Sequence, residues 1–346
     1  ADVPGAHPVG YRGAVLTPTS SGGLVYHDDT VLIVSPEGTI SGLAPLAEAR
    51  GACPLIHDLS GSLLVPGFVD AHLHFPQSRV IGSASGPLLT WLERVVFPEE
   101  ARFRDEPYAR TVAAEFTEAC AARGTTTVGA YSSSSPRATE VLFEALHESG
   151  LRAVAGLVLM DQACPEPIRL PAAEALAACR ELALRWHGAD GGRLQVAVIP
   201  RFAISCSRGL MEGAAALAAE HGLTIMTHVS ENPREEAETL HVHPWAHDYL
   251  DVYEQVGLVG EHTMLAHAIH LAPAAWDRLA ARGAKIAHCP DSTFFLGSGA
   301  MRLAEARARG VPVGLGTDVA AGRSFDVRRT IAHAYDASLL TESGAT

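Results

Sequence analysis

Residues 66–74 read Pro-Gly-Phe-Val-Asp-Ala-His-Leu-His, where the apolar run Leu63–Val69 gives way to a polar cluster. Residues two apart on a β-strand point to the same face, so the pattern predicts that His72 and His74 leave one side of a strand together. Two imidazoles on one face can share a metal ion at about 2.1 Å each. The stretch therefore predicts a buried strand that ends in a metal site.

An apolar run followed by a helix-like segment recurs along the rest of the chain. The apolar runs are Leu63–Val69, Thr125–Ala130, Arg152–Leu159, Gln195–Ile199, Leu223–Met226, Thr263–Ala266, Ala284–Ala287 and Val311–Leu315. Segments of helical period between them include Pro107–Arg123, Ala172–Trp186, Leu210–His221, Pro273–Arg282 and Met301–Arg309. Continuous apolar strands that alternate with helices are typical of buried parallel strands in βα units. Eight such units predict an α/β fold, a closed (β/α)8 TIM barrel over residues 63–346.

Residues 1–62 have a different pattern, with short β-rich stretches separated by Gly, Ser, Pro and Asp. Tyr11–Thr17, Leu24–Tyr26 and Thr30–Ser35 have the composition of strands bounded by turns. The pattern predicts the strands of a small N-terminal β-sandwich that precedes the barrel.

Composition narrows the class of protein. The net charge of −13 argues against a nucleic-acid partner, because binding to phosphate backbones needs a basic face. No apolar run approaches the roughly 18 residues of a membrane span, and residues 1–8 lack the features of a signal peptide. The six cysteines are scattered without a Cys-x-x-Cys pair, so no disulfide framework is predicted and a reducing cytoplasm is the simpler location.

Polar side chains follow the predicted strands at their carboxyl ends, which carry the active site in barrels of this kind. They include Arg201 and Phe202 after the fourth strand, His228 and Glu231 after the fifth, His267 at the end of the sixth and Asp318 after the eighth. His228 and Asp318 would complete a shell of three imidazoles and one carboxylate with His72 and His74, which suits Zn²⁺ or a related divalent ion. The capping of a helix is the alternative role for Asp318.

Two further residues have the chemistry that hydrolysis needs. Glu231, three residues after His228, would reach the attacking water as a proton shuttle without being a ligand. His267 would stabilise the water or the developing oxyanion. The alternatives are a solvated charge for Glu231 and a hydrogen-bonded core histidine for His267. Lys285, the only lysine, begins the seventh strand at the opposite end of the barrel, so no bridging lysine for a second metal ion is expected and the site is predicted to be mononuclear.

With these motifs the chain resembles the amidohydrolase superfamily and, within it, the guanine deaminase family. Residues 66–74 are similar to the first-strand signature of the superfamily. Similarity to guanine deaminases in particular lies in Phe75-Pro76-Gln77, Leu89-Thr90-Trp91-Leu92, Phe97-Pro98, Pro200-Arg201-Phe202, Ser205-Cys206-Ser207, His228-Val229-Ser230-Glu231-Asn232, Ala287-His288-Cys289-Pro290 and Gly314-Leu315-Gly316-Thr317-Asp318-Val319. The similarity runs from about Leu63 to about Leu340, the whole predicted barrel.

The resemblance implies a homodimeric enzyme that hydrolyses guanine to xanthine and ammonia. It implies one zinc ion per chain, with Fe²⁺ as the alternative metal, held by His72, His74, His228 and Asp318. Glu231 would shuttle protons, Asp318 would accept one from the attacking water and His267 would assist them. The residues that would contact the purine are His74, Gln77, Arg201, Phe202, His228, Glu231 and Asp318, with Arg201 on its carbonyl oxygen. A loop position for Gln77, an ion pair for Arg201 and core packing for Phe202 are the alternatives.

The chain departs from the family in two places. Asp291-Ser292-Thr293 stand where the family has Asn-Ser-Asn after His-Cys-Pro, so the far wall of the pocket is expected to differ. Family members continue past the eighth strand to complete the β-sandwich, whereas this chain ends at Thr346, so either the chain is cut or its sandwich is incomplete. Other candidate substrates are a pterin, 8-oxoguanine or a triazine-type ring, and the alternative of another class is a non-catalytic barrel scaffold.

Overall fold

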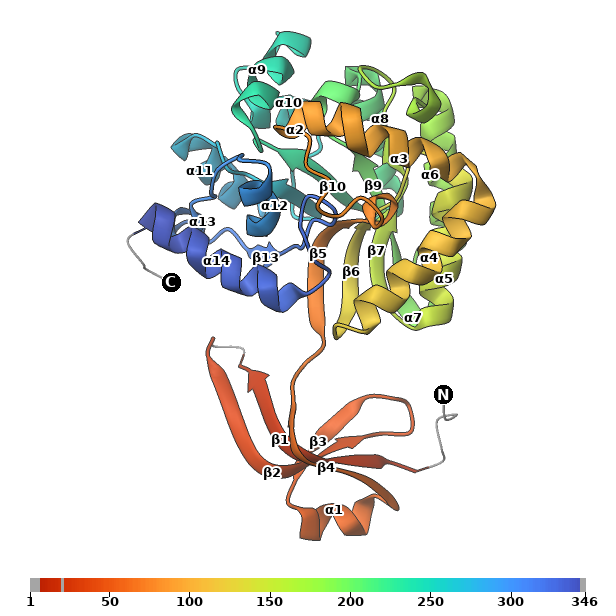
Figure 1. Ribbon diagram of the computed structural model, residues 1–346, viewed down its shortest axis with the longest axis vertical. Helices are drawn as coiled ribbons and strands as arrows, with labels where there is room; N and C mark the ends of the chain where they lie inside the picture. Colours follow the sequence, from red (N-terminus) through yellow and green to blue (C-terminus); the bar gives the residue numbers. More distant parts are fainter. Residues whose placement is uncertain (1–6, 20–21, 343–346) are drawn as a thin grey trace. The chain divides into compact units, whose positions relative to one another are not determined.

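The computed structural model describes residues 7–19 and 22–342, and the chain forms two compact units, residues 1–67 and 68–346 (Figure 1). Pro66 and Gly67 lie between the last strand of the first unit and the first strand of the second. The predicted strand Leu63–Val69 is therefore wrong in its start, because Leu63 and Leu64 end one strand and Phe68 begins another. Pro66 has no N–H to donate to a sheet, which explains the break.

The described part of the first unit holds one four-stranded sheet in the order β3-β2-β1-β4. Its elements are β1 (Val9–Pro18), β2 (Leu24–Val34), β3 (Ile40–Ala44), α1 (Leu46–Ala52) and β4 (Leu55–Leu64). β2 unites two predicted strands, since a bulge opposite Gly13 and Val15 carries the polar residues Asp28 and Asp29 without ending the pairing. Arg12 on β1 binds Asp29 at 2.7 Å. The polar residues of this bulge therefore explain why the sequence predicted two strands instead of one.

The second unit is the predicted barrel. Its eight parallel strands, in sequence and neighbour order, are β5 (Phe68–His74), β6 (Thr125–Tyr131), β7 (Arg152–Gly156), β9 (Leu194–Pro200), β10 (Thr224–Val229), β11 (Thr263–His267), β12 (Lys285–His288) and β13 (Val313–Leu315). The two-residue β8 (Val158–Leu159) continues the run of β7 beside β9. The α/β fold and the order of the eight strands are confirmed.

Hydrogen bonds between β5 and the segment that follows β13 close the barrel. The Asp318 amide donates to the His72 carbonyl at 2.8 Å, and the His74 amide donates to the Val319 carbonyl at 3.1 Å. The buried Asp70 carboxylate adds two bonds, from the amide of Thr317 at 2.9 Å and from its hydroxyl at 2.5 Å. Closure therefore brings Asp318 beside the two histidines of β5.

Helices cover the outside of the barrel in Figure 1. The longer ones are α4 (Glu106–Ala121), α5 (Pro136–Ser149), α6 (Ala172–Trp186), α8 (Arg208–His221), α9 (Pro233–Val242), α11 (Pro273–Arg282) and α14 (Val327–Glu342). Shorter ones are α2 (Leu88–Trp91), α3 (Phe97–Ala101), α7 (Ala189–Gly192), α10 (Tyr249–Gln255), α12 (Pro290–Phe295) and α13 (Leu303–Ala308). Between α2 and α3 lies the π-helix η2 (Leu92–Val96). Within the described residues, no helix combines the length and the apolar character needed to cross a bilayer.

Gly156 allows β7 and β9 to approach closely. A Cβ atom there would collide with the carbonyl oxygen of Ala197 on β9. We expect Gly156→Ala to lower the free energy of unfolding by about 1–3 kcal/mol, the cost of overpacking, measured by guanidinium denaturation. The matched control is Gly209→Ala on α8, where the new methyl group meets no atom within 4 Å. Equal effects of the two substitutions would contradict this account of the β7–β9 contact.

Candidate active site

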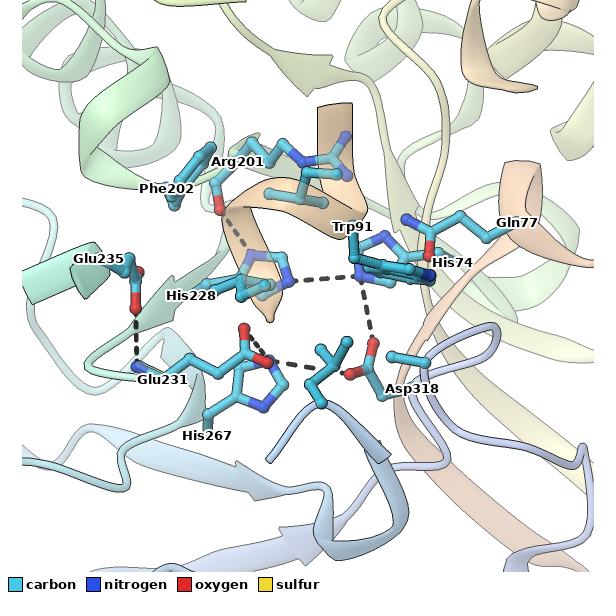
Figure 2. Close-up of a pocket in the computed structure, with 14 residues that line it drawn as sticks. His74, Gln77, Trp91, Arg201, Phe202, His228, Glu231, Glu235, His267 and Asp318 are labelled. Atoms are coloured by element: carbon cyan, nitrogen blue, oxygen red, sulfur yellow. Dashed lines mark hydrogen bonds and ion pairs between the residues drawn. The ribbon is translucent and has the colours of Figure 1, made fainter. Parts of the chain in front are cut away.

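Four predicted metal ligands converge at the carboxyl ends of three strands, and Figure 2 shows three of them, His74, His228 and Asp318. His72 and His74 end β5, His228 lies on β10 and Asp318 follows β13, and all four are buried. Asp318 Oδ1 lies 3.3 Å from Nε2 of His72 and 3.4 Å from Nε2 of His74, and His228 Nε2 lies 3.2 Å from His74 Nε2. Ligands about 2.1 Å from one tetrahedral ion stand about 3.4 Å apart. These three distances therefore have the spacing of a zinc shell. Among the described residues, two sets of ligand atoms lie within 4.8 Å of one another, and they are His72, His74 and His228, and His72, His267 and Asp318.

The hydrogen bonds of His228 set the direction of its free lone pair. Its Nδ1 lies 2.6 Å from the carbonyl oxygen of Arg201, so Nδ1 carries the proton and donates. Its Nε2 is then an acceptor that faces the ring nitrogen of His74. Among the described residues, Nε2 of His72 is buried and has no hydrogen-bond partner. Buried imidazole nitrogens gathered around one carboxylate oxygen are the ligand types of a divalent metal ion, so the donor set fits such an ion.

Residues outside the cluster hold these imidazoles in place. The hydroxyl of Tyr253 donates to the His228 carbonyl at 2.7 Å, and that of Thr227 donates to the Arg201 carbonyl at 3.3 Å. The Tyr131 ring lies 4.5 to 5.0 Å, centroid to centroid, from His72, His74 and His228. These contacts hold the backbone that carries His228 and the Arg201 carbonyl, and that carbonyl orients the His228 ring through Nδ1. Side chains of the protein itself therefore hold the histidines of the site in position.

Glu231 and His267 lie beside the four predicted ligands, and the His267 ring stacks on that of His228 with 5.3 Å between centroids. Glu231 is 3% exposed, and its Oε2 lies 3.4 Å from His267 Nε2. Burial, with the charges of Asp318 and Glu235 nearby, holds the pKa of Glu231 well above its usual value. Burial also lowers the pKa of His267 to about 3, which keeps its imidazole neutral. A buried carboxyl beside a neutral imidazole can hold and pass a proton.

Glu235 fixes the turn that carries Glu231. One oxygen of the Glu235 carboxylate accepts the amide of Glu231 at 2.8 Å and the amide of Asn232 at 3.1 Å, and the other accepts the Tyr249 hydroxyl at 2.6 Å. Ser230, just before this turn, has a φ of 50° in the left-handed region, a conformation that costs about 1–3 kcal/mol. The strained backbone therefore aims the Glu231 side chain at the pocket.

The cluster opens into a narrow pocket between polar and apolar walls (Figure 2). The polar lining residues are His74, Gln77, Arg201, His228, Glu231, Glu235, His267 and Asp318. The apolar lining residues are Leu88, Trp91, Leu92, Phe202, Leu296 and Ala321. Flat apolar walls with a few fixed polar groups are typical of a site for a planar heterocycle. The structure brings together all of the predicted site residues, with His72 in the cluster behind the pocket.

Two comparisons decide the family. Residues 63–343 match the model of the Amidohydrolase family. A probable guanine deaminase of Deinococcus radiodurans is 40% identical over 348 residues, which cover 97% of this chain and 79% of that protein. The chain belongs to the guanine deaminase family of amidohydrolases.

Other members agree in sequence and in fold. The guanine deaminase of Escherichia coli is 40% identical over 281 residues, which are 81% of this chain and 64% of that protein. The solved structure of a guanine deaminase from C. acetobutylicum with bound guanine in the active site superposes with a TM-score of 0.92 at 29% identity. That match covers 96% of this chain and 80% of the solved one. The amidohydrolase family is metal-dependent, which agrees with the cluster of three histidines and an aspartate in this member.

In this guanine deaminase family member, Arg201 has the ion pair that the sequence left as an alternative. Its Nη1 lies 2.6 Å from Oε2 of Glu100, and both side chains are buried. Arg201 also lines the pocket, so the ion pair and a binding role are compatible. Phe202 and Gln77 line the pocket too, and neither is a surface residue.

The loop that departs from the family pattern is built around Asp291. The Asp291 carboxylate accepts the amide of Arg323 at 2.7 Å and its Nε at 2.9 Å, and it lies 3.1 Å from Nδ1 of His333. These contacts join α12 to the loop after β13, which contributes Ala321 to the pocket. Leu296, at the end of α12, forms part of the far wall.

Glu100, Tyr131 and Glu235 were not predicted as site residues. Glu100 lies only in the acidic pair after Phe97-Pro98, and Tyr131 ends an apolar strand like many core residues. Glu235 had a usable signal, because Asn232 and Glu235 have the spacing of a capping box at the start of α9. Lys285 donates to the Glu261 carbonyl at the amino end of β12, far along the strand from the cluster as predicted.

Proposed function

We propose that this protein hydrolyses guanine to xanthine and ammonia with one zinc ion per chain. The observation that carries the proposal is the convergence of four ligand atoms, spaced 3.2 to 3.4 Å, on a pocket whose polar groups match those expected for a purine. The guanine deaminase relatives at 40% identity support the substrate. The site geometry supports a hydrolytic reaction.

His72, His74, His228 and Asp318 would hold the metal, with Fe²⁺ as the alternative to zinc. When bound, such an ion lowers the pKa of water from about 15.7 toward 7 and so supplies hydroxide at neutral pH. Lys285, at the other end of the barrel, offers no bridge to a second ion. We therefore propose a mononuclear site.

The chain's own residues would direct the attack to the purine carbon that bears the amino group. Glu231 would protonate the ring nitrogen next to this carbon and then pass a proton to the leaving amine. Its Oε1 is buried, has no hydrogen-bond partner among the described residues and is free for this role. Asp318 would accept the proton of the attacking water, and the neutral His267, 3.9 Å from its Oδ2, would orient the groups.

Arg201 and Gln77 would recognise the polar edge of the purine, and apolar side chains would hold its faces. Arg201 would donate to the carbonyl oxygen, since a guanidinium has several donors and keeps its charge. Phe202 and Trp91 line the pocket on its apolar walls. Trp91 uses its indole N–H on the Ser83 carbonyl at 2.9 Å, so its ring is fixed in orientation.

A substrate panel tests the proposal. Zinc-loaded protein is incubated with guanine, a pterin, 8-oxoguanine and a triazine, and ammonia release is measured for each. We expect the largest kcat/KM for guanine. Preference for another ring would refute guanine as the substrate but not the proposed metal site. Bound metal without turnover of any ring would favour the non-catalytic scaffold. The solved triazine hydrolases resemble this chain at only 20–22% identity, which bears on the fold alone.

A cytoplasmic location and a homodimer are also part of this proposal. The location rests on the six cysteines, which are scattered along the sequence without a Cys-x-x-Cys pair. The homodimer is an implication of the family resemblance. Sedimentation equilibrium tests it, because a dimer has twice the chain mass of 36.4 kDa.

A further inference from the structure

Three polar side chains with almost no solvent exposure lie together at one wall of the pocket. Glu100 is 2% exposed, Gln77 2% and Arg201 3%. Oε2 of Glu100 lies 2.6 Å from Arg201 Nη1, and its Oε1 accepts Gln77 Nε2 at 3.1 Å. Gln77 and Arg201 line the pocket, but Glu100 does not. One carboxylate behind the wall thus binds both pocket groups at once.

These bonds determine what the two groups present to a ligand. Gln77 donates an N–H of its Nε2 to Glu100, and its Oε1 accepts the Ala320 amide at 3.4 Å and keeps its second lone pair as an acceptor. Glu100 neutralises the charge of the Arg201 guanidinium, which keeps its remaining N–H donors. The Cζ atom of Arg201 lies 5.3 Å from the centroid of the Phe97 ring. A buried carboxylate that meets two donors fixes their orientation, because rotating either one would leave a buried polar group unpaired.

We propose that Glu100, on α3, is a positioning residue that sets the ring-recognition pattern of the pocket through Arg201 and Gln77. The proposal rests on the guanine deaminase function proposed above and deepens it. Glu100 touches neither the ring nor the reacting atoms. It holds one donor group and one acceptor group in a fixed geometry, which a planar purine with complementary edges can use without reorganisation.

Glu100→Gln tests the proposal with little change of shape. An amide brings its own N–H donors toward two donors and removes the charge that balances Arg201. We expect the KM for guanine to rise at least about tenfold while kcat changes less than about threefold, because the residues at the reacting carbon are untouched. The zinc content, measured by atomic absorption, should stay at the wild-type value.

The adjacent Glu99 offers a matched control. It is 7% exposed and pairs with Arg102 at 2.9 Å and with the Tyr108 hydroxyl, and it does not line the pocket. Glu99→Gln therefore also breaks a largely buried carboxylate contact on α3, but we expect the KM for guanine to remain unchanged. A similar rise in KM for both variants, or a joint loss of kcat and zinc in Glu100→Gln, would show a merely structural role and overturn the proposal.

A crystal structure of the Glu100→Gln variant separates this proposal from the proposed function. We expect the side chains of Arg201 and Gln77 to leave their present positions in the variant. Unchanged positions would overturn the positioning role even if the wild-type protein deaminates guanine. Conversely, wild-type protein without guanine turnover would refute the proposed function, while displaced side chains would still support the role of Glu100.

Discussion

Glu231→Gln is expected to lower kcat for guanine at least ~10²-fold, the usual contribution of a positioned proton-transfer group. Glutamine keeps the shape of the side chain but cannot take up and release a proton. Because Glu231 is not among the four ligand atoms, the zinc content of the variant should equal that of the wild type. The test is steady-state kinetics with parallel metal analysis.

Glu238→Gln is the control for this substitution. Glu238 lies seven residues after Glu231 and is exposed on α9, so its loss should leave kcat near the wild-type value. Near-normal turnover of Glu231→Gln with metal bound would refute the proton-shuttle role.

His72→Ala is expected to remove most of the zinc and to lower kcat/KM at least ~10³-fold, because the hydroxide supply depends on the metal. His72 belongs to both groups of side chains that could hold an ion among the described residues. Metal content and ammonia release are measured on the same dialysed sample. Incubation of the wild type with a chelator should produce the same loss, and added zinc should reverse it.

His262→Ala is the matched control, since this histidine precedes β11 at the opposite end of the barrel and its side chain is 71% exposed. It should keep full zinc content and activity. A His72→Ala protein that retains stoichiometric zinc would contradict the assigned ligand set, even if its activity were low.

The sequence predicted the barrel because its strands are continuous apolar runs and because polar residues stop those runs at one end. The prediction of strand boundaries was wrong where the composition of a segment is typical of another structure. The run from Leu63 crosses Pro66 and Gly67, so hydrophobicity alone merged the end of β4 with the start of β5. Asp28 and Asp29 look like a turn but form a bulge within β2.

The site residues that belong to a local sequence motif were predictable. Residues that meet only through contacts between distant parts of the chain were not. His72 and His74 share a strand face by their spacing alone. Glu100 and Arg201 are 101 positions apart, and nothing near either residue in the sequence indicates their ion pair. Local motifs thus indicate the side chains that line the pocket, whereas the groups that hold them in place become visible only in the folded structure.

Isotope labelling tests the central claim most directly. Zinc-loaded protein is mixed with guanine in H₂¹⁸O, and the purine product is examined by mass spectrometry while ammonia is quantified. We predict xanthine that carries one ¹⁸O atom on the carbon that bore the amino group, with one ammonia released per xanthine. Unchanged guanine with metal bound, or a product without ¹⁸O, would contradict hydrolytic deamination by this site.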